Sequence, residues 1–227
     1  PVAYGALFLA AEEAIHAVDP EAQVLVGGTF FHEQIIPGTI SFISEMLAAH
    51  PEIPSRADGV AVHPYTFYPP RVPPEEDGDG EVPIWEMYSQ LRELTGDLPI
   101  VVTEMGWPTW SPLSEEDQAA WLTRGMLLSQ AAGITDLCWY TLYDDEEPAN
   151  QEGSFGLTRW DESWKPSGDA FAALAERAAL AEGVAAVPDL AEGAWGVSYG
   201  AAGAAYWGEG EVCGEVLGDV PTWIEEP

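Results

Sequence analysis

The chain has 227 residues, and its hydrophobic fraction of 47% is enough for one domain with a core and a small appendage, which excludes a disordered chain. Its 39 acidic and seven basic residues give a formal net charge of −32. Such a charge repels phosphate backbones and anionic lipid surfaces, so we expect no nucleic-acid partner and no membrane partner. It also fits a protein that is kept soluble in high salt.

The first predicted element is a helix over residues 2–18, which Asp19-Pro20 ends. Its apolar side chains follow the three-to-four spacing of a buried stripe made of Tyr4, Leu7, Phe8, Ala11, Ile15 and Val18. Residues 24–28 read as a short buried strand, and residues 29–33 form the loop at its carboxyl end. A second helix is predicted over residues 40–49.

The next predicted strand covers residues 59–65 and ends in His63-Pro64-Tyr65. Alternation of side chains places Ala61, His63 and Tyr65 together on its inner side. Residues 68–83 are rich in Pro, Gly and acid, a composition that predicts a surface loop. A helix over residues 84–94 follows.

The central stretch of the sequence runs from Pro99 to Thr109. Its β-branched run, bounded by a proline, predicts a buried strand that Gly106 and Pro108 end. Alternation puts Ile100, Val102 and Glu104 on one face, so a single carboxylate stands at the carboxyl end of the strand above an apolar column. Parallel α/β proteins keep their chemistry at this end of their strands.

The remaining strand–helix units repeat the pattern. Ser114 opens a helix with an acidic first turn that runs to Ala132, and Gly133 closes it. Residues 137–143 form a fourth strand with Trp139 at its inner end, residues 144–164 a loop, and residues 166–181 the last helix. Strands that alternate with helices predict a parallel sheet with the helices outside.

The character of the sequence changes after Val184. Short segments with aromatic residues and valines lie between glycines, which predicts a small β appendage that packs rather than catalyses: residues 194–199, 204–208 and 211–216. We therefore expect two parts, residues 1–183 and residues 184–227.

The segment Thr-Glu-Met-Gly-Trp-Pro-Thr at residues 103–109 resembles the nucleophile strand of the clan A glycoside hydrolases, closest to the branch of β-xylosidase-like, iduronidase-like and cellulase-like enzymes. His63-Pro64-Tyr65 and Trp139 follow the clan's pattern in the right order, and the resemblance covers roughly the first four-fifths of the chain. It implies an α/β fold of the (β/α)8 TIM-barrel type. Since a whole barrel has about 250 residues, the chain would supply the second half, strands five to eight, with a β appendage like that of several clan families.

The resemblance also implies an activity, the retaining hydrolysis of O-glycosyl bonds in an oligosaccharide or polysaccharide. Glu104 would be the nucleophile. The acid/base glutamate, usually preceded by asparagine, would lie on a strand before Pro1. Because the chain opens on Pro1 without a methionine or a basic signal region, we expect it to be the interior of a longer polypeptide. A secreted or extracellular location is favoured. The expected partners are a carbohydrate substrate and the missing N-terminal half of the barrel.

Five further positions are expected to contact the nucleophile or the sugar. Tyr65 and His63 match the sixth-strand position that hydrogen-bonds either one, although a buried histidine satisfied by a backbone carbonyl explains His63 equally well. Trp139 matches the tryptophan on which the sugar ring lies, with core packing as its alternative. Other aromatic residues in the loops at the strand ends are candidates for a saccharide groove, among them Trp107 and Tyr143, with Tyr68, Trp110 and Trp160.

No metal and no cofactor are expected. Asp144 to Glu147 lack the alternation and the glycine of a calcium loop and read as a solvated acidic loop. Three histidines, His16, His32 and His50, have no ligand spacing. The cysteines lack the CxxC spacing of a metal or redox site, and we expect a buried thiol at Cys138 and an incidental one at Cys213.

Two alternatives to a hydrolase remain from the sequence. One is a barrel fragment that binds carbohydrate without catalysis, and the other is a structural half-barrel that assembles with a partner. Glu104 together with Tyr65 and Trp139 favours the hydrolase over the first alternative, and only the sequence before Pro1 separates the hydrolase from the second.

Overall fold

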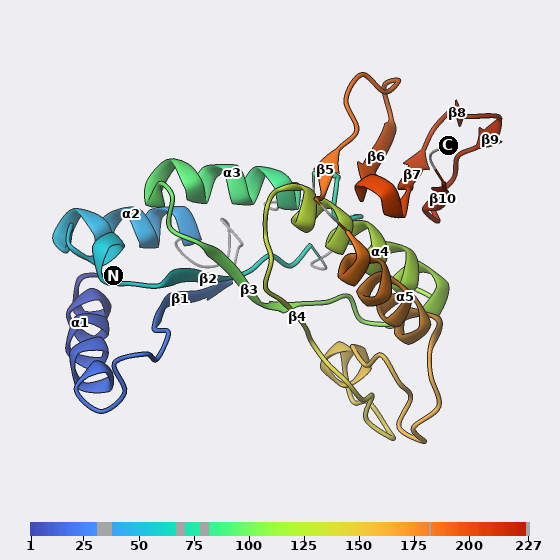
Figure 1. The fold of residues 1–227 in the computed structure, drawn as a ribbon. Coiled ribbons are helices and arrows are strands. Elements are labelled where there is room, and N and C mark those ends of the chain that lie inside the picture. Colours follow the sequence, from blue (N-terminus) through green and yellow to red (C-terminus); the bar gives the residue numbers. More distant parts are fainter. Residues whose placement is uncertain (31–37, 67–70, 78–81, 182, 226–227) are drawn as a thin grey trace. The chain divides into compact units, whose positions relative to one another are not determined.

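The computed structural model of the chain describes residues 1–30, 38–66, 71–77, 82–181 and 183–225 (Figure 1). It divides into two compact units, each of which is described by itself. The N-terminal unit comprises residues 1–72, 76–105 and 136–138, and the C-terminal unit comprises residues 73–75, 106–135 and 139–227.

A four-stranded sheet with the order β1-β2-β3-β4 is the centre of the N-terminal unit. Its strands are β1 (Leu25–Phe30), β2 (Gly59–His63), β3 (Ile100–Met105) and β4 (Leu137–Trp139), the last of which leaves the unit at Trp139. The β1–β2 and β2–β3 pairs are parallel, as the alternation of strands and helices predicts. The carboxyl ends of β1, β2 and β3 therefore meet at one edge.

The helices of this unit are α1 (Val2–His16), α2 (Thr39–Ala49) and α3 (Ile84–Thr95), with a short 3-10 helix at Ile53–Ser55. Figure 1 shows α2 and α3 along one side of the strands. Their apolar side chains and those of the strands form the core, which includes the fully buried Ile43, Met46, Val60, Val62, Met87, Leu91 and Val102. The predicted helices and strands of this unit are confirmed within a few residues at each end, apart from the faces of α1.

The buried face of α1 differs from the predicted stripe. Leu7 is 65% exposed and Ile15 is also exposed, whereas Gly5, Phe8 and Glu12 are buried. The reason is the close approach of α2: a Cβ on Gly5 would lie 2.4 Å from the His50 ring. The sequence spacing identified an apolar helix, but the neighbouring helix selected which side of it is covered.

A glycine pair shapes the end of β1. Gly27 and Gly28 both have positive φ angles, and the register between β1 and β2 shifts between Gly27 and Thr29. A Cβ on Gly27 would lie 2.5 Å from the Ala61 carbonyl oxygen, so glycine is required there. The bulge moves the last residues of β1, including Phe30, relative to β2.

The C-terminal unit is built on α4 (Glu115–Ala131) and α5 (Pro166–Leu180), which pack side by side, with a 3-10 helix at Gln151–Ser154 between them in sequence. Ser114 caps α4 as predicted: its hydroxyl accepts from the Asp117 amide (3.1 Å), and the Asp117 carboxylate accepts from the Ser114 amide (2.9 Å). Gly133 follows the helix with φ at 79°.

The predicted β appendage is an antiparallel sheet with the order β10-β7-β6-β5, and β8 and β9 form a separate small pair. The strands are β5 (Ala185–Ala186), β6 (Ala194–Ser198), β7 (Ala204–Gly208), β8 (Glu211–Val212), β9 (Glu215–Val216) and β10 (Thr222–Ile224), with a 3-10 helix at Gly200–Ala202. The Tyr199 hydroxyl donates to Gln130 of α4, and Arg177 of α5 lies 4.0 Å over the Trp223 ring. The sheet thus packs on both helices. The domain boundary between residues 183 and 184 stays a prediction.

A buried ion pair also fixes this sheet. Arg124 of α4 donates to the Glu75 carboxylate (2.7 Å), and the indole N–H of Trp207 on β7 donates to the same oxygen (3.1 Å). All three side chains are buried. Removal of either charged partner would leave the other charge buried, so this contact strongly couples the sheet to α4.

The expectation of a buried Cys138 is wrong, because both Cys138 and Cys213 are free and exposed. Cys138 lies on β4 at the edge of the four-stranded sheet, where few neighbours cover a side chain. Among the helices of the described ranges, none is long and apolar enough to cross a bilayer.

Candidate functional site

The carboxyl ends of β2 and β3 bring Tyr65 and Glu104 together. The Tyr65 hydroxyl donates to Glu104 Oε2 at 2.9 Å. The chain turns directly after β2, with the Tyr65 amide donating to the His63 carbonyl oxygen (3.0 Å), and this turn aims the phenol across the sheet edge. Tyr65 is buried, whereas the Glu104 side chain is 41% exposed. The result is an accessible carboxylate with a fixed orientation.

His63 lies close to two residues at the end of β3, Thr103 and Glu104. Its Nε2 is 2.9 Å from the Thr103 hydroxyl, and its Nδ1 is 3.6 Å from Glu104 Oε2. Burial lowers the pKa of His63 below its ordinary value, and the nearby negative charge of Glu104 raises it by less. The lowered pKa favours the neutral imidazole, which places no positive charge beside the carboxylate.

The position of Glu104 departs from strict alternation along β3. Val62 pairs with Val102 and both are fully buried, so His63 and Thr103, one residue further, share the opposite face. The sequence prediction grouped Glu104 with Val102, yet its carboxylate lies near the His63 ring. In the described strands, the pairing of β2 with β3 ends at Val62 and Val102. The residues of β3 after Val102 are therefore not held to the alternation of the paired strand.

Phe30, at the end of β1, lies at the same edge of the sheet and packs against Tyr65. Its ring centroid is 5.5 Å from that of Tyr65, and its backbone oxygen accepts from the Thr39 hydroxyl at the start of α2 (2.9 Å). Sequence reasoning identified Glu104, His63 and Tyr65 but missed Phe30 and Thr103. The signal for Thr103 was present, since it directly precedes Glu104 on a strand end.

In the C-terminal unit, two tryptophans that were predicted to contact the sugar lie together. Trp107 and Trp139 have ring centroids 6.0 Å apart, and Trp139 donates its indole N–H to the Phe155 carbonyl oxygen (3.0 Å). Trp139 is partly exposed. Trp107 is fully buried and packs edge-on against Trp121, so its place in the structure is that of a packing residue.

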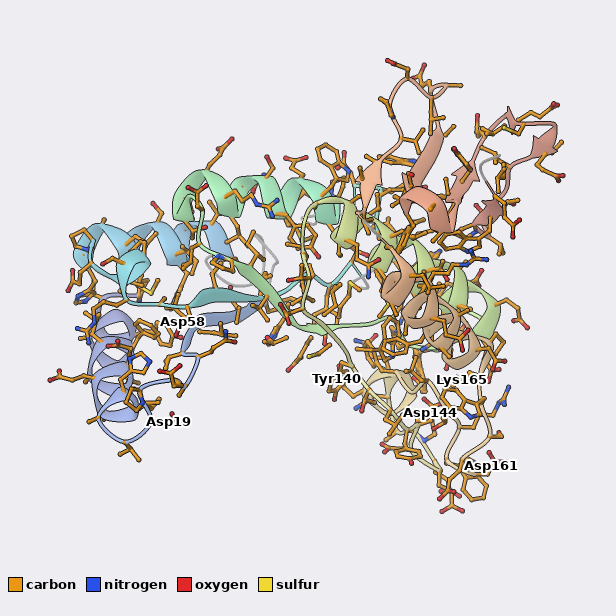
Figure 2. All side chains as sticks on the ribbon, in the orientation of Figure 1. Asp19, Asp58, Tyr140, Asp144, Asp161 and Lys165 are labelled. Atoms are coloured by element: carbon orange, nitrogen blue, oxygen red, sulfur yellow. The ribbon has the colours of Figure 1, made fainter. Side chains whose placement is uncertain are left out.

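The acidic loop at Asp144 to Glu147 is only partly solvated as predicted. Glu146 and Glu147 are exposed, but Asp144 forms an ion pair with the buried Lys165 (2.6 Å), and both residues are labelled in Figure 2. Lys165 also donates to the Thr109 hydroxyl at 3.0 Å. Burial lowers the pKa of Lys165, and the bond to Asp144 opposes this. The lysine thus joins the loops that follow β3 and β4.

The remaining candidates of the C-terminal unit lie at its surface. Tyr143 is 52% exposed, and Trp160 and Trp110 are exposed as well. The predictions for Tyr68 and His32 lie outside the described residues. Over the described ranges, no group of three His, Cys, Asp or Glu side chains is arranged to hold a metal ion.

The chain matches known proteins by its structure but not by its sequence. No protein-family model matches the sequence, and none of the curated proteins is similar to it. Among solved structures, the chain is similar to a family 39 glycoside hydrolase from the gut symbiont Bacteroides cellulosilyticus WH2. That likeness has a TM-score of 0.66 and 24% identity, and it covers 90% of this chain and 44% of the other.

Two further solved structures are also similar to this chain. A monomeric β-xylosidase from Caulobacter crescentus CB15 has a TM-score of 0.55 and 20% identity over 94% of this chain and 45% of its own. A family 17 β-1,3-glucanosyltransferase from Rhizomucor miehei has a TM-score of 0.51 and 18% identity over 72% of this chain and 56% of its own. The chain spans about half the length of these proteins. It therefore has the fold of part of a TIM barrel, which it shares with these solved structures, with an antiparallel sheet after it.

Proposed function

We propose that the chain carries the nucleophile of a retaining glycoside hydrolase, and that this nucleophile is Glu104. The observation that carries the proposal is the hydrogen bond from the Tyr65 hydroxyl to Glu104 Oε2 at a strand end. An accessible carboxylate at the carboxyl end of a barrel strand, held by a buried donor, fits a group that must attack a carbon atom along one direction. The fold that the chain shares with glycoside hydrolases supports the same reading.

The proposed reaction has two steps. In the first, a Glu104 oxygen attacks the anomeric carbon while a second carboxylic acid protonates the departing glycosidic oxygen, which leaves a glycosyl ester on Glu104. In the second, that second carboxylate takes a proton from water, and the water oxygen displaces Glu104 from the same carbon. Two carboxyl groups about 5 to 5.5 Å apart are required. The second one is proposed to lie in the barrel half that precedes Pro1.

The other residues have supporting roles in this proposal. Tyr65 fixes one Glu104 oxygen and leaves the other to react. The neutral His63 bridges toward Thr103 and holds the end of β3 without pairing with the nucleophile's charge. Trp139 of the C-terminal unit is proposed, from the resemblance alone, to pack on the face of a sugar ring, since an indole offers a large apolar surface with little loss of entropy.

The substitution Tyr65→Phe tests the role of the hydroxyl. A hydrogen bond to a charged group is worth about 1.5 to 3 kcal/mol, so we expect kcat on aryl glycosides to fall roughly 10- to 100-fold. KM should change little, because the phenyl ring keeps its packing on Phe30. Steady-state kinetics of the complete protein measure both constants.

Tyr4→Phe is the matched control for this test. It removes a hydroxyl in the same unit that bonds the Gly27 backbone and not the carboxylate. We expect a lower melting temperature with kcat unchanged. Equal losses of kcat in both variants, or no loss in Tyr65→Phe, would contradict the assigned role of Tyr65.

A further inference from the structure

Two exposed aromatic side chains share one face of the loop between β4 and α5. Tyr143 is 52% exposed and Trp164 is 55% exposed. Isolated β-bridges pair Tyr143 with Thr158 and Thr158 with Trp164. Directly paired residues project their side chains to the same side, so the two rings flank Thr158. Thr158 itself is buried, as a small residue between two large ones would be.

The backbone holds both aromatic residues in place. On one side, the Thr158 amide donates to the Leu142 carbonyl oxygen (3.0 Å), and the Asp144 amide donates to the Thr158 carbonyl oxygen (3.0 Å). On the other side, the Lys165 amide donates to the Leu157 carbonyl oxygen (3.0 Å). Tyr143 and Trp164 therefore stand on fixed backbone, and their rings lose little entropy when a ligand binds.

Gly168 of α5 supports the Trp164 ring. A Cβ on Gly168 would lie 2.1 Å from Cε3 and 2.7 Å from Cζ3 of the indole. Only glycine lets the six-membered ring rest this closely on the helix backbone. The ring is thus backed on one side and more than half exposed, an arrangement that presents a flat apolar surface to solvent at a cost in hydrophobic free energy.

The charges around the two rings select the class of ligand. Both cations of this fully described loop are engaged, Arg159 with Glu115 and Lys165 with Asp144. Exposed carboxylates nearby, Asp145, Glu146, Glu147, Asp161 and Glu162, repel anions and accept hydrogen bonds from hydroxyl groups. Aromatic faces for C–H groups beside acceptors for O–H groups match a neutral sugar.

We propose that Tyr143 and Trp164 form a binding platform for neutral saccharides on the C-terminal unit. The proposal rests on the proposed function, because it assumes that the protein meets saccharides, but it needs no contact with Glu104. The platform binds the sugar through stacking and adds no chemical step.

Affinity electrophoresis of the complete protein tests this proposal. Native gels contain arabinoxylan, laminarin or hydroxyethylcellulose as neutral probes, and carboxymethylcellulose is the anionic match of the last. The protein carries Glu104→Gln so that the polymers are not cut. We expect at least one neutral polymer to retard it and carboxymethylcellulose not to. Trp164→Ala or Tyr143→Ala should each lower the affinity about tenfold, and Trp164→Phe by less.

Trp85→Ala is the matched control, since Trp85 is an exposed tryptophan on α3 of the other unit. It should leave the retardation unchanged. Retardation that survives both Trp164→Ala and Tyr143→Ala, or that is absent with every neutral polymer, overturns the platform. Turnover of aryl glycosides by the protein with Glu104 intact is a separate readout. Active protein without retardation therefore removes the platform alone, and inactive protein with Trp164-dependent retardation keeps it.

Discussion

Replacing Glu104 with glutamine in the complete protein should lower kcat on aryl glycosides by roughly 10⁴-fold or more, while sugar binding persists. The amide has nearly the same shape as the carboxylate, and its oxygen can still accept the hydrogen bond from Tyr65. It carries no negative charge and is a poor nucleophile, so the glycosyl ester cannot form. Steady-state kinetics measure the loss, and titration calorimetry with the product sugar measures the binding.

Glu93→Gln is the matched control, because it removes the same charge from an exposed position on α3. Its kcat should equal that of the unchanged protein. A second variant, Glu104→Ala, leaves space for an external anion. With azide present, we expect this variant to release a glycosyl azide of inverted anomeric configuration, since azide attacks from the face that Glu104 occupied. Near-normal activity of Glu104→Gln would place the chemistry elsewhere.

Thermal unfolding of the 227-residue chain should depend strongly on salt. The chain has 39 acidic residues against seven basic ones, and the described ion pairs occupy Arg56, Arg124, Arg159 and Lys165. Most carboxylates therefore repel one another, which destabilises the compact state. The Debye length falls from about 30 Å at 0.01 M to about 3 Å at 1 M salt. We expect KCl over this range to add about 3 kcal/mol, or roughly 10 °C in Tm.

The double variant Glu146→Gln with Glu147→Gln controls for effects of salt other than screening. Both residues are exposed, and the substitutions make the net charge less negative without disturbing the Lys165–Asp144 pair. Calorimetry should give a higher Tm at low salt and a smaller gain from KCl than in the unchanged chain. A Tm that is flat or falling with KCl would show that charge repulsion does not limit stability.

The order of strands and helices was predictable because each element has a local signal. The β-branched run before Glu104 and the capping pair of Ser114 and Asp117 depend on residues within one segment. The meeting of Tyr65 and Glu104 was also predictable, since parallel neighbouring strands bring their carboxyl ends to one edge. Local pattern, topology and the resemblance together were sufficient for this part of the site.

Contacts that depend on distant segments were not predictable. The loss of alternation at Glu104 and the hydrogen bond between His63 and Thr103 depend on where the register of β2 and β3 ends. Asp144 looked like one acid among several, because its partner Lys165 lies on another part of the loop. The exposure of a side chain was not predictable for a similar reason. The burial of Trp107 follows from its packing on Trp121, which spacing along the chain does not encode.

The most direct measurement of the central proposal is a covalent label on the nucleophile. A glycoside with a 2-fluoro group and a good leaving group slows the second step more than the first, so the glycosyl ester accumulates. The 2-fluoro xyloside and glucoside with dinitrophenyl leaving groups are suitable probes for the complete protein. Intact mass spectrometry gives the stoichiometry, and peptide mapping gives the site.

We predict one label per protein molecule, on the peptide that contains Thr103-Glu104-Met105, with loss of activity in proportion to labelling. Glu104→Gln should take up no label, while Tyr65→Phe should be labelled at the same site more slowly. Labelling of an active protein on Glu33 or within Asp144 to Glu147, with Glu104 unmodified, would contradict the assignment of Glu104 as the nucleophile.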